Sequence, residues 1–83
     1  MISERIRTLD ITEYLCPMTF VKAKLFLESC VPNQIVDILL HSGEPLDNLP
    51  LALEADGHHI LAIESQDASG SIYMLKVKVA NSL

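Results

Sequence analysis

Cysteine is scarce in this 83-residue chain, which contains only Cys16 and Cys30. The residues between them have helical periodicity from Pro17 onward. An unbroken helix would place the two thiols roughly 20 Å apart, at about 1.5 Å per residue, whereas a disulfide requires Cα atoms within about 7 Å of each other. We therefore expect two free thiols, and with them a reducing compartment, the cytoplasm.

Basic residues are also few. The six Lys and Arg residues are outnumbered by eleven Asp and Glu residues, which gives a net charge of −5, and the basic residues form no stripe along the chain. This composition argues against direct nucleic-acid binding, whose usual signature is clustered positive charge. It is compatible with solubility and with a basic protein partner.

Long apolar runs and metal-binding patterns are missing from the sequence. No stretch approaches the roughly 20 apolar residues of a membrane span, and no basic segment leads into an apolar run, so we expect neither membrane insertion nor a signal peptide. No Cys-x-x-Cys pair is present, and the three histidines, His41, His58 and His59, lack zinc-ligand spacing. We expect no metal and no other cofactor.

The chain does contain enough apolar sequence for one core. Hydrophobic residues make up 49% of it, so a single domain over residues 1–83 can fold without disulfides or a metal. Periodicity and turn residues divide this domain into six elements in the order β-α-β-α-β-β. The expected elements are a strand at Arg5–Ile11, a helix at Pro17–Cys30, a strand at Ile35–Leu40, a helix from Asp47 or Asn48 to just before Gly57, and strands at His58–Glu64 and Ser71–Ala80.

The apolar pattern predicts how these elements pack. Ile35–Leu40 is almost continuously apolar, which is typical of a central strand largely buried on both faces. The segment from His41 to Pro45 is predicted to be a loop because of its glycine and proline. The last two strands are joined by a short polar turn and should form a hairpin. We predict an α+β fold, a two-layer sandwich in which two helices cover one face of a four-stranded mixed sheet.

The first helix carries two apolar stripes. One stripe should pack on the sheet and makes Cys30 a core thiol; it consists of Phe20, Ala23, Phe26, Leu27 and Cys30. The second stripe starts beside Cys16 and consists of Met18, Val21 and Leu25. It can pack against the second helix, the commoner arrangement, or it can form a docking surface next to the thiol.

Cys16 stands directly before Pro17, and proline is favoured at the first position of a helix. Cys16 is therefore predicted to be the N-cap, where the helix dipole favours the thiolate and lowers the pKa of the thiol. If Thr19 is the third helical residue, its N–H can also donate to the thiolate. The alternative is that Cys16 is a buried N-cap residue that acts as a small hydrophobe.

With these residues in place, the chain resembles the TusA (SirA-like) family of small sulfur carriers over about Thr8 to Val79. The resemblance rests on a Leu-Asp pair six residues before a Cys-Pro motif, on Gly57 and His58, and on the element order. Three positions depart from the family pattern: Glu13 and Asn33 replace usual glycines, and Thr19 replaces the second proline of Cys-Pro-x-Pro. Cys-Pro-Met-Thr with a Gly-Glu-Pro loop at residues 43–45 resembles a branch of the family.

The resemblance implies a sulfurtransferase-type carrier with Cys16 as the catalytic residue. A persulfide donor, such as a cysteine desulfurase or a rhodanese, would load Cys16, and the persulfide would pass to an acceptor protein. Family acceptors serve tRNA thiolation, molybdenum cofactor maturation or sulfur metabolism. The helix-start residues Pro17, Met18 and Thr19 would support the thiolate, and the possible accessory residues are Asp10, Glu13 and His58.

Two of the accessory residues have simpler interpretations. A carboxylate near Cys16 would raise the pKa of the thiol, but Glu13 is more often a residue that points into solvent, where its charge is screened. His58 follows a helix-ending glycine and is more often a surface or capping residue.

Two other functions compete with the sulfur carrier. The first is a non-catalytic regulatory or interaction module in which Cys16 is structural, and the loss of the second motif proline favours it. The second is nucleic-acid binding, because the topology is similar to that of the C-terminal domain of a bacterial translation initiation factor. That similarity concerns the fold alone, and the negative charge weighs against it. We expect the protein to be a monomer.

Overall fold

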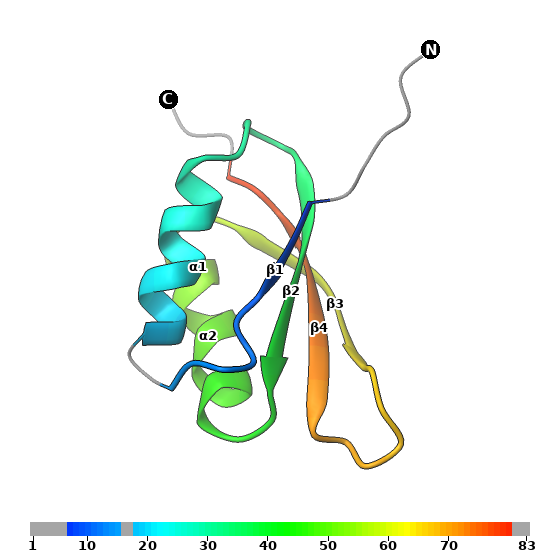
Figure 1. The fold of residues 1–83 in the computed structure, drawn as a ribbon. Helices are drawn as coiled ribbons and strands as arrows, with labels where there is room; N and C mark the ends of the chain where they lie inside the picture. Colours follow the sequence, from blue (N-terminus) through cyan, green and yellow to red (C-terminus); the bar gives the residue numbers. More distant parts are fainter. Residues whose placement is uncertain (1–6, 16–17, 81–83) are drawn as a thin grey trace.

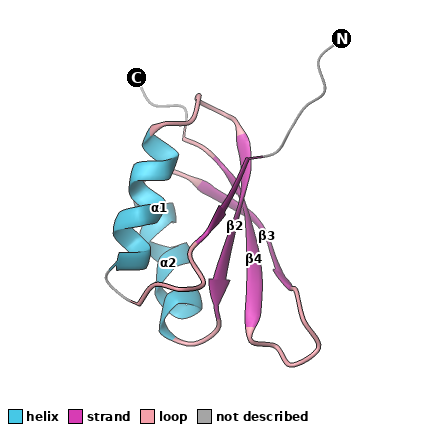
Figure 2. Cartoon of the chain, in the orientation of Figure 1, coloured by secondary structure: helices cyan, strands magenta, loops and turns pink. Residues whose placement is uncertain are grey.

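The computed structural model describes residues 7–15 and 18–80, which form two layers, a sheet and a pair of helices (Figure 1). The elements follow the predicted order. They are β1 (Arg7–Asp10), α1 (Met18–Glu28), β2 (Ile35–His41), α2 (Glu44–Ala55), β3 (His59–Ser65) and β4 (Ile72–Lys78). Both helices lie on the same face of the sheet (Figure 2), so the predicted fold class is confirmed.

The four strands form one mixed sheet in the order β1-β2-β4-β3. β1 pairs with β2 in parallel, and β4 pairs antiparallel with both of its neighbours. A parallel pair needs a long crossover connection, and here α1 lies within it. β1 is shorter than the predicted strand Arg5–Ile11, of which residues 5 and 6 lie outside the described residues.

The core lies between the sheet and the helices. Val36, Ile38 and Leu40 of β2 are fully buried, as are Leu75 and Val77 of β4. Along β4 these buried residues alternate with the half-buried Met74, Lys76 and Lys78. The prediction that β2 is largely buried on both faces is confirmed on the face toward the helices and met in part on the other, where Asp37 and Leu39 are half-buried. Both helices pack on the face away from these two side chains, and Asp37 pairs with Lys76 of β4 at 3.2 Å.

α1 ends two residues earlier than predicted. The backbone N–H and the hydroxyl of Ser29 both donate to the carbonyl of Phe26, at 3.1 and 2.7 Å, which closes the last turn before Cys30. Asn33 follows with φ 67, a left-handed conformation that asparagine tolerates better than most residues. Pro17, the predicted first residue, lies outside the described residues.

α2 begins earlier than predicted. The prediction of a loop through Pro45 and a cap at Asp47 or Asn48 is wrong: the carbonyl of Gly43 accepts the N–H of Asp47 at 2.9 Å, and the helix starts at Glu44. Proline costs no hydrogen bond in the first turn of a helix, so Pro45 fits there. Pro50 then falls inside the helix.

The end of α2 matches the prediction. Gly57 has φ 99, a conformation that glycine adopts without a Cβ clash. Its N–H donates to Glu54, and the N–H of His58 donates to Leu53, both at 3.0 Å. These two bonds satisfy the last carbonyls of the helix in the Schellman arrangement.

The final hairpin is also confirmed. β3 pairs with β4, and the register slips by one residue at Leu61, the position of a β-bulge. The turn between them is held by Asp67, whose carboxylate accepts the backbone N–H groups of Ser71 at 3.0 Å and Ile72 at 3.3 Å. These bonds lower the pKa of Asp67.

Both helices begin at the same end of the sheet. α1 starts where the chain returns from β1, and α2 starts where it leaves β2, so the two helix N-termini lie at the lower end of the molecule in Figure 1. The loop of residues 11–15 lies at this end. The C-termini of both helices lie at the opposite end of the sheet.

Candidate functional site

The predicted reactive residue, Cys16, and its neighbour Pro17 lie outside the described residues. The structure does describe what comes before and after them: the loop from Ile11 to Leu15 and the first turn of α1 from Met18. The candidate site therefore consists of these residues, which flank Cys16 and Pro17 in the sequence.

Asp10 shapes the loop that leads to Cys16. Its carboxylate accepts the backbone N–H of Thr12 at 2.9 Å and the hydroxyl of Thr12 at 2.7 Å. This is an Asx-type turn. The hydroxyl contact, followed by the backbone N–H, holds the pKa of Asp10 below its ordinary value, so the carboxylate stays ionised. Asp10 is thus a positioning residue for the loop.

The loop is also attached to the core. Ile11 is buried, and its N–H donates to the carbonyl of Leu39 at 2.9 Å, which continues the β1–β2 pairing by one residue. The N–H of Tyr14 donates back to the carbonyl of Ile11 at 3.2 Å. The Leu-Asp pair of the sequence motif therefore starts a short segment that is fixed at both ends before Cys16.

The carbonyl of Leu15 begins the hydrogen bonds of α1. It accepts the N–H of Met18 at 2.7 Å and the N–H of Thr19 at 3.3 Å. The Thr19 N–H therefore has one described acceptor, the Leu15 carbonyl. That it also donates to a Cys16 thiolate stays a prediction, because Cys16 lies outside the described residues. Thr19 itself is 1% exposed and belongs to the buried face of the helix.

The start of α1 differs electrostatically from the start of α2. α2 has two carboxylates in its first turn, Glu44 and Asp47, which complement the positive end of its own dipole. The first turn of α1, as far as the structure describes it, has no acidic residue. No described residue of this turn therefore neutralises the positive end of the α1 dipole, so an anion supplied by another residue can bind there. Cys16 precedes this turn in the sequence.

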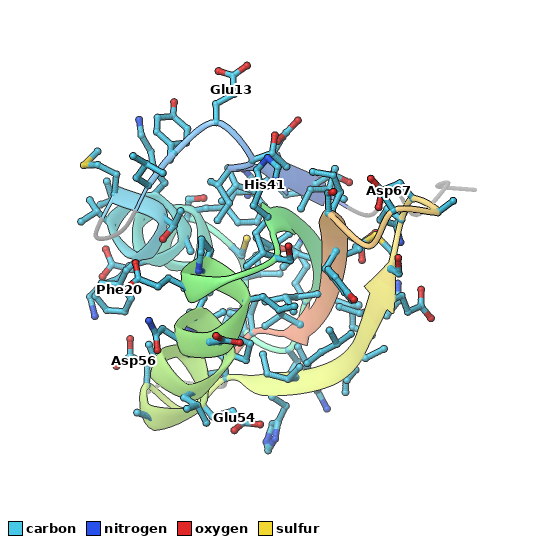
Figure 3. All side chains as sticks on the ribbon, turned by 90° about the horizontal axis from the view of Figure 1, so that it is seen from below. Glu13, Phe20, His41, Glu54, Asp56 and Asp67 are labelled. Atoms are coloured by element: carbon cyan, nitrogen blue, oxygen red, sulfur yellow. The ribbon has the colours of Figure 1, made fainter. Side chains whose placement is uncertain are left out.

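Two further charges lie near this end. The Lys22 ammonium is 5.1 Å from the centre of the Tyr14 ring, a cation–π contact that ties the loop to the helix. Glu13 is exposed and projects away from the body of the protein (Figure 3). In that position water screens its charge, as the solvent-facing interpretation expected.

The second apolar stripe of α1 does not pack against α2. Met18, Val21 and Leu25 are all exposed, so the interpretation as helix–helix packing is wrong. The buried residues of α1 are Thr19, Ala23 and Leu27, which point toward the sheet. At about 3.6 residues per turn, the stripe falls on the opposite side of the helix.

His58 and Cys30 lie at the other end of α1. They share a pocket of about 280 Å³ with Lys24 and Glu28, and Glu28 is about 15 Å along the helix axis from Met18. The Cys30 thiol is half-buried and donates to the carbonyl of Phe26 at 3.3 Å. The structure therefore separates both residues from those that flank Cys16.

His58 has a structural contact at this far end. Its Nδ1 accepts the backbone N–H of Ala80 at 2.9 Å, which joins the segment after α2 to the segment after β4. Burial lowers the pKa of His58; the nearby Asp56 opposes that shift and Lys24 adds to it. The Lys24–Asp56 ion pair itself spans 3.2 Å between the two helices.

Within residues 7–15 and 18–80, no group of three or more His, Cys, Asp or Glu side chains could hold a metal ion. In the same ranges, no helix has the length and apolar character needed to cross a bilayer.

Sequence reasoning missed three residues that shape the site: Thr12, Tyr14 and Lys22. The Asp10-x-Thr12 spacing is a local turn signal and could have identified Thr12. The pairing of Tyr14 with Lys22 joins a loop to a helix across eight residues, and no short-range pattern indicates it.

Comparisons with known proteins identify the family of this chain. A sequence profile of the family described as "Sulfurtransferase TusA" matches residues 7–77. A protein of Archaeoglobus fulgidus is 31% identical over 61 residues, which cover 74% of this chain and 69% of that protein. A protein of Thermotoga maritima is 28% identical over 72 residues, covering 87% and 91%. Both are named "Putative sulfur carrier protein".

Proposed function

This chain belongs to the TusA sulfurtransferase family, and on that basis we propose that it is a sulfur carrier which holds sulfane sulfur as a persulfide on Cys16. The observation that carries the proposal is the family match over residues 7–77, which includes Cys16. The start of α1 supports it, because its first turn has no carboxylate of its own among the described residues.

The proposed reaction is an exchange of one sulfur atom. The Cys16 thiolate attacks the outer sulfur of a donor persulfide, and a new S–S bond forms as the S–S bond of the donor breaks. The donor cysteine leaves as a thiolate. The proton carried by the outer sulfur remains on that sulfur, which is now bound to Cys16. No external oxidant or reductant is needed. In the second half-reaction, the acceptor takes the outer sulfur and Cys16 returns to a thiolate.

The chain's own residues stabilise the anion and hold the loop before Cys16. The helix dipole stabilises an anion at its N-terminus by roughly 0.3–1 kcal/mol, whether that anion is a thiolate or a persulfide. Asp10 and Thr12 hold the loop that presents Cys16. A neighbouring general base is not required, because the attacking group is already ionised in part at neutral pH.

The partners are part of the proposal. The donor is a persulfide-bearing protein such as a cysteine desulfurase or a rhodanese, and the acceptor is a protein in tRNA thiolation, molybdenum cofactor maturation or sulfur metabolism. A carrier cysteine must stay a free thiol to accept sulfur, and thiols stay reduced in the cytoplasm, which is why we place the protein there.

Sulfur loading tests the proposed function. After incubation with glutathione persulfide, the intact mass should rise by one sulfur atom, and Cys16→Ser should abolish the gain. Cys30→Ser is the matched control and should load normally, because Cys30 is half-buried and hydrogen-bonded to Phe26. Loading that survives in Cys16→Ser would refute the site. No loading at all would favour a regulatory module in which Cys16 is structural.

A further inference from the structure

α1 is apolar on both sides. One side, with Ala23 and Leu27, is buried against the sheet. The side that faces solvent also carries large apolar residues, where an amphipathic surface helix normally carries polar ones. Val21 is 40% exposed, Met18 43% and Leu25 60%. Large apolar side chains are usually buried, so these three residues on the outer side of α1 lack the cover that their type usually has.

The exposed apolar side chains lie along α1 and in the loop before it. Met18, Val21 and Leu25 are spaced by three and four residues, so they lie above one another on the helix. The loop before the helix adds Leu15, which is 80% exposed, and Tyr14. We call these five residues the α1 strip. Cys16 stands in the sequence between two of its members, Leu15 and Met18.

A cation lies beside the strip. The chain has a net charge of −5, and of the two lysines of α1, Lys24 is offset by Asp56 at 3.2 Å. Lys22 lies four residues after Met18, on the edge of the strip, and its ammonium contacts the Tyr14 ring at 5.1 Å. An acidic group on a partner would be attracted to Lys22.

We propose that the α1 strip is the docking surface for the protein that delivers sulfur to Cys16, and that this donor presents an apolar surface with a carboxylate opposite Lys22. The inference rests on the proposed function, because exchange of a sulfur atom brings the donor cysteine into contact with Cys16. A donor in that position covers the residues on either side of Cys16, which are members of the strip.

The size of the strip fits such an interface. A standard protein–protein interface buries about 800 Å² on each partner, a patch roughly 30 Å across. Leu25 lies about 10 Å along the helix axis from Met18, so an interface centred on the first turn of α1 reaches the far end of the strip. Apolar side chains at the centre of an interface supply much of its affinity, and charges at its rim mainly set the association rate.

The experiment compares a small donor with a protein donor on the full-length chain. The small donor is glutathione persulfide; the protein donors are a cysteine desulfurase supplied with cysteine and a rhodanese supplied with thiosulfate. The variants are Leu25→Gln and Val21→Gln, since glutamine keeps the helix propensity near that of leucine. Leu61→Gln is the matched control, because Leu61 is 48% exposed but lies on β3, at the other edge of the sheet from β1.

Glutathione persulfide should load Cys16 equally fast in all of these variants. With the protein donor that loads the wild type, the second-order rate constant should fall at least about fivefold in Leu25→Gln and Val21→Gln, as is typical for a residue that matters at an interface. It should stay within about twofold in Leu61→Gln. Lys22→Glu should slow loading most at low salt, and added salt should remove part of the effect.

The outcomes separate the two proposals. If the strip variants and Leu61→Gln load alike from the protein donor, the docking surface is refuted and the carrier function stands. If glutathione persulfide loads the wild type but neither protein donor does, the docking proposal is again refuted. If glutathione persulfide does not load Cys16, the proposed function fails, and the docking inference fails with it.

Discussion

His58 offers the sharpest test of the structure, because one hydrogen bond connects two chain segments that are far apart in sequence. Its Nδ1 accepts the N–H of Ala80 at 2.9 Å, and both residues are half-buried. We consider His58→Phe, which keeps an aromatic ring of similar size and removes the acceptor. The N–H of Ala80 then loses its protein partner.

The expected cost follows from that one bond. An intramolecular hydrogen bond contributes about 0.5–1.5 kcal/mol net to the free energy of unfolding, and water can reach a half-buried N–H in part. We therefore expect a loss of about 1 kcal/mol at pH 7.5. For a domain of 60–100 residues this lowers Tm by roughly 4–8 °C, a shift that thermal unfolding followed by circular dichroism resolves.

The pH dependence gives a second, independent readout. Burial lowers the pKa of His58 below its usual 6.5, so the folded protein holds the neutral ring more strongly than the unfolded chain does. The stabilisation is complete above pH 6.5 and is lost as the pH falls toward the lower folded value, because the unfolded chain then binds more protons. Asp10 and Asp67 also have lowered pKa values, but from 3.8, so their contributions are lost only in a more acidic range.

The wild type should therefore lose stability between pH 7 and pH 5 more steeply than His58→Phe. The matched control is His59→Phe, the next residue in the chain, whose side chain is exposed; it should keep both the wild-type Tm and the wild-type slope. Equal slopes in the wild type and His58→Phe would contradict the assignment of His58 as a neutral acceptor. So would an equal loss of Tm in the two variants.

Two further predictions concern the candidate site. Iodoacetamide should modify Cys16 well before Cys30, since the Cys30 thiol is half-buried and bonded to Phe26; equal rates would remove the helix-dipole argument for a reactive Cys16. Thr19→Pro should raise the pKa of Cys16 by about one unit or less, measured by ultraviolet thiolate absorbance, because it removes an N–H that the thiolate can accept from. It should also cost about 1 kcal/mol in unfolding free energy, because it deletes the bond to the Leu15 carbonyl while the shorter Met18 bond remains. An unchanged pKa would show that the Thr19 N–H does not hold the thiolate.

Much of the fold could be predicted because its signals are local. The alternation in β4, the apolar run of β2 and the buried stripe of α1 each come from one continuous segment whose period matches its secondary structure. Gly57 and Asn33 mark turns because few other residues adopt a positive φ at low cost. The start of α2 was misplaced because a proline in the first turn of a helix and a proline in a loop look alike in sequence.

Part of the site could be predicted for the same reason. The Leu-Asp pair, Cys16 and Pro17 are close together in the chain, and their spacing alone indicates the family. The bond from the Thr19 N–H to the Leu15 carbonyl was not predictable, because it depends on the residue at which the helix begins.

By itself the sequence determined the order of the elements, much of the core and the motif around Cys16, since each of these depends on neighbours within a few positions. The exact core of α1 was decided by the tertiary structure: Thr19 is buried, whereas Phe20, Phe26 and Cys30 of the predicted stripe are half-buried. The tertiary structure also decided which apolar surfaces stay uncovered, since both helices pack on one face of the sheet and the Met18, Val21 and Leu25 side of α1 faces solvent. An apolar stripe has the same pattern whether a second helix covers it or not, and only the placement of α2 distinguishes the two cases.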